Sequence, residues 1–72
     1  MDNYEIEVRD LNGNRRRIKG SRTEVYQLLV SGSEEIVEGD EVMWISLNGS
    51  VIWSVLASGD ILNTEDLIGF LA

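Results

Sequence analysis

The fold is decided by residues 4–20, which read YEIEVRDLNGNRRRIKG. Apolar Tyr4, Ile6 and Val8 alternate with charged residues, and this period of two is typical of a half-buried β-strand. A second strand is expected over residues 15–20, after a turn rich in Asn and Gly. The stretch therefore predicts a β-hairpin near the start of the chain.

The length of the turn sets which residues face each other. A two-residue Asn-Gly loop would put Arg17 on the apolar face. A three-residue loop over residues 11–13, with Gly13 left-handed, instead sets Ile6 opposite Ile18. We therefore expect the three-residue loop. Its register opposes three charged pairs, of which the first two are favourable: Glu7 with Arg17, Glu5 with Lys19, and Arg9 with Arg15.

The Leu-Asn-Gly triplet of residues 11–13 recurs at residues 47–49. Each triplet lies between two strand-like runs, and each pair of runs precedes a helix-like segment. The sequence thus predicts one α+β domain over 1–72, built as tandem ββα–ββα with a four-stranded antiparallel sheet and two helices. Its expected parts are a first unit (1–32), an acidic connection (33–40) and a second unit (41–72).

The two helix segments carry recognisable start signals. Ser21 and Glu24 have the spacing of a capping box, and Gly32 is suited to end that helix. The last helix is expected to begin near Asn63 or Thr64, because acidic residues follow in its first turn. The buried side chains expected from the two helices are Val25, Leu28, Leu29, Leu67, Phe70 and Leu71.

The second hairpin, expected over about residues 41–57, is more apolar than the first. If it keeps the phase of the first hairpin, its core positions are Val42, Trp44, Ile52 and Leu56. The opposite face then carries five apolar side chains: Met43, Ile45, Val51, Trp53 and Val55. An exposed patch of this size marks a protein interface, with Trp53 as its anchor. The alternative is that one helix lies on each face, or that the register differs, so that all five are core.

Composition excludes several chemistries. The 72 residues contain no Cys, His or Pro and carry a net charge of −7. Without Cys and His there is no disulfide, no thiol nucleophile and no imidazole base, and the commonest zinc ligands are missing. A chain this short also has little room for a substrate pocket. We expect neither an enzyme nor a cofactor.

The charges are divided along the chain. Residues 1–22 hold all six basic residues and four acidic ones, whereas residues 23–72 hold nine carboxylates and no basic residue. This asymmetry favours a basic protein partner or, alternatively, serves only solubility. The acidic candidates for the contact are Glu34, Glu35, Glu38, Asp40 and Glu41. Their spacing does not match a calcium loop, so no metal site is predicted, although the carboxylates could imitate nucleic-acid phosphates.

The basic run over residues 15–22 is a weak signal for nucleic-acid binding. Two of its charges are expected to pair with Glu5 and Glu7, and no aromatic residues interleave it for base stacking. The acidic start of the chain does not resemble a signal peptide, and residues 42–59 are too polar to span a membrane. We therefore expect a cytoplasmic protein.

In size, negative charge and lack of cysteine, the chain resembles the small acidic inhibitors that bacteriophages and mobile elements make against host nucleases, including anti-CRISPR proteins. No motif accompanies this resemblance, so it assigns no functional residue. It implies an inhibitor that occupies a basic site on a host nucleic-acid-handling protein, in the host cytoplasm. The alternative is a self-associating structural or regulatory domain whose apolar Trp53 face forms a homodimer interface.

Overall fold

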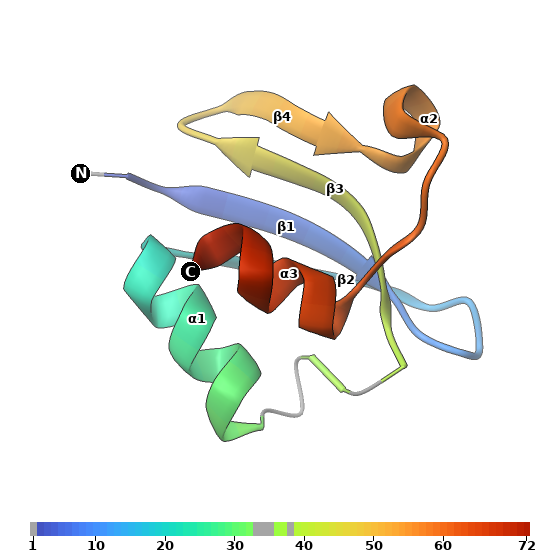
Figure 1. Cartoon of the computed structure of the whole chain (residues 1–72), viewed down its shortest axis with the longest axis horizontal. Helices are drawn as coiled ribbons and strands as arrows, with labels where there is room; N and C mark the ends of the chain where they lie inside the picture. The colour runs from blue at the N-terminus through green and yellow to red at the C-terminus, as the bar shows by residue number, and fades with distance from the viewer. Residues whose placement is uncertain (1, 33–35, 38) are drawn as a thin grey trace.

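The computed structural model describes residues 2–32, 36, 37 and 39–72 of the chain. One antiparallel sheet has the strand order β2-β1-β3-β4, with β5 pairing β3 beside it (Figure 1). The elements are β1 (Tyr4–Arg9), β2 (Arg15–Gly20), α1 (Arg22–Ser31), β3 (Glu41–Leu47), β4 (Ser50–Ser54), α2 (Val55–Ser58), β5 (Leu62–Asn63) and α3 (Thr64–Leu71). The α+β class is confirmed, but the tandem ββα–ββα layout is not reproduced in full, because α2 and β5 are additional elements between β4 and α3.

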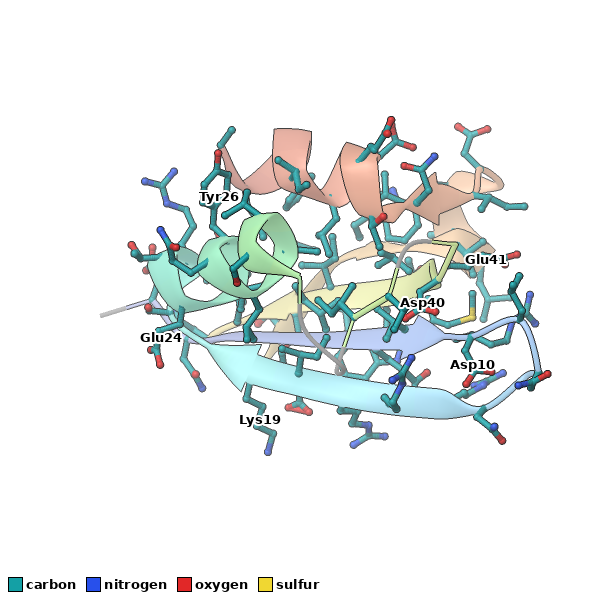
Figure 2. The ribbon with its side chains drawn as sticks, turned by 90° about the horizontal axis from the view of Figure 1, so that it is seen from below. Asp10, Lys19, Glu24, Tyr26, Asp40 and Glu41 are labelled. Carbon is teal, nitrogen blue, oxygen red and sulfur yellow. The ribbon has the colours of Figure 1, made fainter. Side chains whose placement is uncertain are left out.

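The sheet and the two longer helices form two layers. Helices α1 and α3 cover one face of the sheet, and Lys19 points away from the opposite face (Figure 2). We call this opposite face the open face. The core between the layers consists of Tyr4, Ile6, Val8, Ile18, Val25, Ile36, Val42, Ile45, Leu67 and Leu71.

The first hairpin has the predicted register. Ile6 pairs with Ile18 across β1 and β2, and Gly13 has a positive φ of 85°. The loop closes with the amide of Asp10 donating to the carbonyl of Asn14 at 2.9 Å. The three-residue loop over residues 11–13 is thus confirmed. The three predicted charged pairs also lie opposite each other: Glu7 with Arg17, Glu5 with Lys19, and Arg9 with Arg15.

The second hairpin turns differently, although it has the same triplet. Leu47 pairs with Ser50, which leaves Asn48 and Gly49 as a two-residue loop. Both have positive φ, 52° and 87°, as the tight turn favoured by Asn-Gly requires. Leu47 belongs to the strand here, whereas its counterpart Leu11 lies in the first turn and is exposed.

Two bulges correct the predicted faces of the second hairpin. Glu7 pairs with Trp44 and Val8 with Val42, so Met43 is an extra residue in β3. A bulge shifts the alternation of the strand by one position. Val42 is in the core as predicted, but Ile45, not Trp44, is the next core residue.

The same shift continues into β4. Ile45 pairs with Trp53 and Ser46 with Val51, so Ile52 is the extra residue of a second bulge. Trp53 packs against the core, and the face predicted to carry Met43, Ile45, Val51, Trp53 and Val55 together does not form. Two predicted core residues are exposed instead, because Ile52 lies at the bulge and Leu56 lies on α2.

Helices α1 and α3 begin where the sequence predicted. Ser21 and Glu24 form a capping box, and Gly32 ends α1 with a φ of 76°. Asn63 caps α3 in a second box with Asp66. Leu67, Leu71 and Val25 are buried as predicted, while Leu28 and Leu29 are only partly buried against the core. Phe70 is 44% exposed, so its assignment to the core is wrong.

Candidate protein-binding surface

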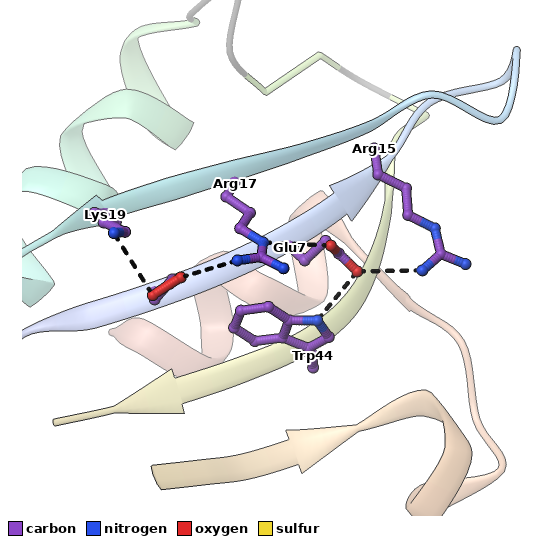
Figure 3. Close-up of polar contacts among 6 residues, drawn as sticks. Glu7, Arg15, Arg17, Lys19 and Trp44 are labelled. Atoms are coloured by element: carbon purple, nitrogen blue, oxygen red, sulfur yellow. Dashed lines mark hydrogen bonds and ion pairs between the residues drawn. The ribbon is translucent and has the colours of Figure 1, made fainter. Parts of the chain in front are cut away.

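A cluster of polar contacts surrounds Glu7 on the open face (Figure 3). The side chain of Glu7 is only 10% exposed. Its Oε2 accepts a hydrogen bond from the indole Nε1 of Trp44 at 3.1 Å and lies 3.5 Å from Nη1 of Arg15. Its Oε1 lies 3.6 Å from Nε of Arg17. One carboxylate therefore joins side chains of three neighbouring strands, since these partners come from β2 and β3.

The indole of Trp44 is part of this cluster. The guanidinium carbon of Arg17 lies 5.4 Å from the centre of its ring, within range of a cation–π contact. Glu5 lies 3.9 Å from both Arg17 and Lys19. The charged side chains of β1 and β2 thus form a row on the open face, and Glu7 and Arg17 of this row contact Trp44.

Two carboxylates of the predicted acidic site are used inside the fold. Asp40, 3% exposed, accepts from Nη2 of Arg16 at 2.9 Å and from the amide of Val37 at 3.0 Å. Glu41 pairs with Nη2 of Arg9 at 2.8 Å. These ion pairs link Asp40 to β2 and Glu41 to β1. Glu34, Glu35 and Glu38, the other predicted acidic contacts, lie outside the described residues.

The ion pairs leave the charge of the described residues strongly unbalanced. Five of the six basic side chains pair with Glu5, Glu7, Asp40 or Glu41, and Arg22 donates to the carbonyl of Leu71 at 3.1 Å. Other carboxylates have no ion pair with any described residue, and these are Asp2, Asp10, Glu24, Asp60, Glu65 and Asp66. These six carboxylates consequently give the described surface an excess of negative charge.

The pKa of Glu24 lies below its ordinary value of 4.5. Hydrogen bonds lower its pKa: first the bond from the backbone amide of Ser21, then the bond with the Ser21 side chain. Both favour the charged form. Glu24 is therefore an ionised cap of α1 at neutral pH and adds to the acidic surface.

A hollow of about 480 Å³ lies beside the Glu7 cluster, where the open face meets α2. This volume is in the range of pockets that hold small molecules or the side chains of a partner. Two apolar side chains on its rim are exposed, Leu56 at 95% and Ile61 at 65%. The residues that line the hollow are Glu7, Arg9, Arg15, Glu41, Met43, Trp44, Ser54, Val55, Leu56 and Ile61.

Because of the two bulges, the predicted apolar contact residues do not share one face. Ile45 is fully buried in the core, and Trp53 packs against it. Val51 is 63% exposed on the edge strand β4. Only Met43 and Val55 reach the hollow. An apolar surface does exist on this side of the sheet, but it is centred on Trp44 rather than on Trp53.

Sequence reasoning missed Trp44, Leu56 and Ile61 as surface residues. The signal for α2 was available, because Ser54 is a good N-cap and Gly59 a good C-terminal stop: Ser54 caps the helix, and Gly59 is left-handed. The run of apolar residues 42–45, which lacks alternation, was the available sign of a bulge in β3.

Residues 2–32, 36, 37 and 39–72 contain no group of three or more His, Cys, Asp or Glu residues arranged to hold a metal ion. None of the helices in the described part of the chain has the length and hydropathy needed to span a membrane. Comparison with known proteins adds no identification: no family model, no curated protein and no solved structure matches this chain.

Proposed function

We propose that this chain is a non-enzymatic protein-binding module for a basic protein partner. The observation that carries the proposal is the imbalance of charge. The basic side chains are occupied by four carboxylates and a backbone carbonyl, and six described carboxylates have no cationic partner among the described residues. A surface of this kind attracts a basic patch over a distance of about 8 Å at physiological salt and speeds encounter with it.

The narrower proposal is that the partner handles nucleic acid and that the chain inhibits it by occupying its basic site. The size of the chain, its charge of −7 and its resemblance to small acidic phage inhibitors support this reading. A basic groove shaped for phosphates would accept closely spaced carboxylates. The host cytoplasm is the location that this function implies.

The partner can be sought by capture from a lysate of the source cells at low salt, with identification by mass spectrometry. Association kinetics are then measured at two salt concentrations. Changing Glu34, Glu35 and Glu38 together to Lys should slow association strongly and flatten its salt dependence, because the attraction is long-range. The melting temperature should change little.

Glu5→Gln is the matched control, because this carboxylate already faces Arg17 and Lys19. It should leave the association rate close to that of the unmodified chain. If the triple Lys variant associates as fast as the unmodified chain, the acidic surface serves solubility and the proposal is wrong. If the captured partner has no nucleic-acid-related activity that the chain inhibits, only the narrower proposal fails.

A further inference from the structure

Two exposed apolar side chains lie on the rim of the hollow, and an exposed carboxylate lies next to one of them in the sequence. Leu56 is 95% exposed on α2, and Ile61 is 65% exposed a few residues later. Asp60, directly before Ile61, is exposed and pairs with no basic side chain of the described chain. Side chains of this kind on a small domain favour a contact with another molecule. Residues 55–61 therefore present two exposed apolar side chains, Leu56 and Ile61, which we call the knobs, and the negative charge of Asp60.

The hollow itself offers the complementary groups. Met43, Trp44 and Val55 form an apolar wall, and the charged side consists of Arg9 and Arg15 with the carboxylates of Glu7 and Glu41. Arg15 is 60% exposed and reaches only 3.5 Å from Glu7, a carboxylate that Arg17 also contacts. The guanidinium of Arg15 has five N–H donors, and this long contact is the one it makes with a described side chain.

Arg9, the cross-strand neighbour of Arg15, makes an additional anion beside Arg15 more favourable. Arg15 lies directly opposite Arg9, and like charges in this position repel. Arg9 has Glu41 at 2.8 Å, so it is better neutralised than Arg15. Among the described residues of the open face, the ion pairs join four basic side chains to three carboxylates: Arg9, Arg15, Arg17 and Lys19 to Glu5, Glu7 and Glu41. Of the two cations that line the hollow, Arg15 is the more exposed, at 60% against 42% for Arg9.

We propose that two copies of this chain form a two-fold dimer in which residues 55–61 of each copy occupy the hollow of the other. Leu56 and Ile61 would contact Met43 and Trp44 of the second copy, and Asp60 would pair with its Arg15. A two-fold interface requires that one patch carry both halves of every contact. This patch does so, because the knobs and the hollow lie side by side on each chain.

The complementary charges of Asp60 and Arg15 on the same chain favour a second copy as the occupant. Two chains of net charge −7 repel each other over most of their surfaces, so they can meet only where negative charge is absent or balanced. Residues 42–59 contain no charged side chain, and the adjoining open face has a surplus cation. The inference goes beyond the proposed function, because it concerns another surface and needs no foreign protein to test it.

The most direct test is a charge exchange between two variants, followed by light scattering and sedimentation. Arg15→Glu alone would set two carboxylates against each other at both contacts, and Asp60→Arg alone would set two guanidinium groups against each other. Each variant alone should dimerise about tenfold or more weakly than the unmodified chain. An equimolar mixture should recover dimer, because in the mixed pair one contact joins the two native partners and the other joins the two exchanged charges.

The apolar contact is tested by Leu56→Ser, with Leu11→Ser as the matched control. Both leucines are highly exposed, so neither change should lower the melting temperature appreciably. Leu11 does not line the hollow. Leu56→Ser should raise the dissociation constant of the dimer at least about tenfold, whereas Leu11→Ser should not change it.

The unmodified chain should approach a mass of twice 8.1 kDa as its concentration rises. The proposal is overturned if the chain remains a monomer up to a concentration on the order of 1 mM. It is also overturned if the charge-exchanged mixture shows no more dimer than its two components. A monomer that binds an acidic, apolar peptide at Trp44 would assign the hollow to a foreign partner instead.

Discussion

The two Leu-Asn-Gly triplets give the most instructive comparison in this molecule. Residues 11–13 form a three-residue loop in which only Gly13 is left-handed, whereas residues 47–49 place Leu47 in the strand and make a two-residue turn. The first loop joins two regular strands of six residues each. The second joins strands that each contain an extra residue at a bulge.

The difference shows that a turn motif acts together with the strands that it joins. In the first hairpin, β1 alternates strictly between charged and apolar residues, and one register keeps Ile18 of β2 on the apolar side. In the second, residues 42–45 are all apolar, so the side chains do not select a face and a bulge can decide it. Ile45 packs in the core, and the indole of Trp44 lies on the opposite face, where it donates a hydrogen bond to Glu7.

The largest expected effect concerns the residue that the bulge turns inward. Ile45→Ala should cost about 2–5 kcal/mol of unfolding free energy, because Ile45 is fully buried opposite Ile6. A domain of this size has only about 3–5 kcal/mol, so the variant should be largely unfolded. Val51→Ala on the edge strand is the control and should cost about 0.5 kcal/mol. Urea titration followed by circular dichroism would distinguish the two, and equal small losses would contradict the bulged register.

The next effect tests how the regular hairpin is joined to the bulged one. Glu7→Gln keeps the shape of the side chain but removes the charge that holds Arg15, Arg17 and Trp44. It should cost about 1–3 kcal/mol, since the carboxylate is nearly buried. Glu5→Gln, whose contacts are long and partly exposed, should cost less than about 1 kcal/mol. Chemical denaturation measures both, and a Glu5 variant as damaging as the Glu7 variant would refute the central role of Glu7.

A smaller effect distinguishes the two turns. Asn48 is left-handed, and its Oδ1 accepts from the amide of Asn3. Asn48→Ala should therefore cost about 1–2 kcal/mol. The matching Asn12→Ala should cost about 0.5 kcal/mol or less, because among the described non-glycine residues only Asn48 has positive φ. Equal costs in thermal melts would mean that the two triplets form the same turn.

The smallest effect concerns the helix that follows the first hairpin. Because hydrogen bonds from Ser21 lower the pKa of Glu24, its ionised form stabilises α1. This contribution is present above the ordinary pKa of 4.5 and is lost as the pH falls through the lower pKa of the folded chain. Ser21→Ala removes the side-chain hydrogen bond and keeps the backbone one, so it should move the pKa of Glu24 only part of the way back towards 4.5 in an NMR titration. An unchanged pKa would exclude the side chain of Ser21 as a cause and leave its backbone amide.

The sequence predicted those parts of the fold that local patterns determine. These are the register of the first hairpin, the loop over residues 11–13, and the starts of α1 and α3. It did not predict the bulge at Met43, because consecutive apolar residues leave the phase of a strand open and the choice depends on packing in the core around Ile6 and Leu67. The same error affected the candidate surface. The sequence predicted Trp53 on the open face of the sheet, whereas the structure places Trp44 there.

The face assignment of β3 underlies the core, the Glu7 cluster and the hollow, and nuclear Overhauser contacts test it most directly. The structure predicts contacts from the methyl groups of Ile45 to those of Ile6, and from the Trp44 ring to the side chain of Arg17. Contacts from the Trp44 ring to Leu67 and Leu71, with Ile45 free of the core, would contradict it. In that case the alternation of the first hairpin would extend through β3, and the surface around Trp44 would not exist.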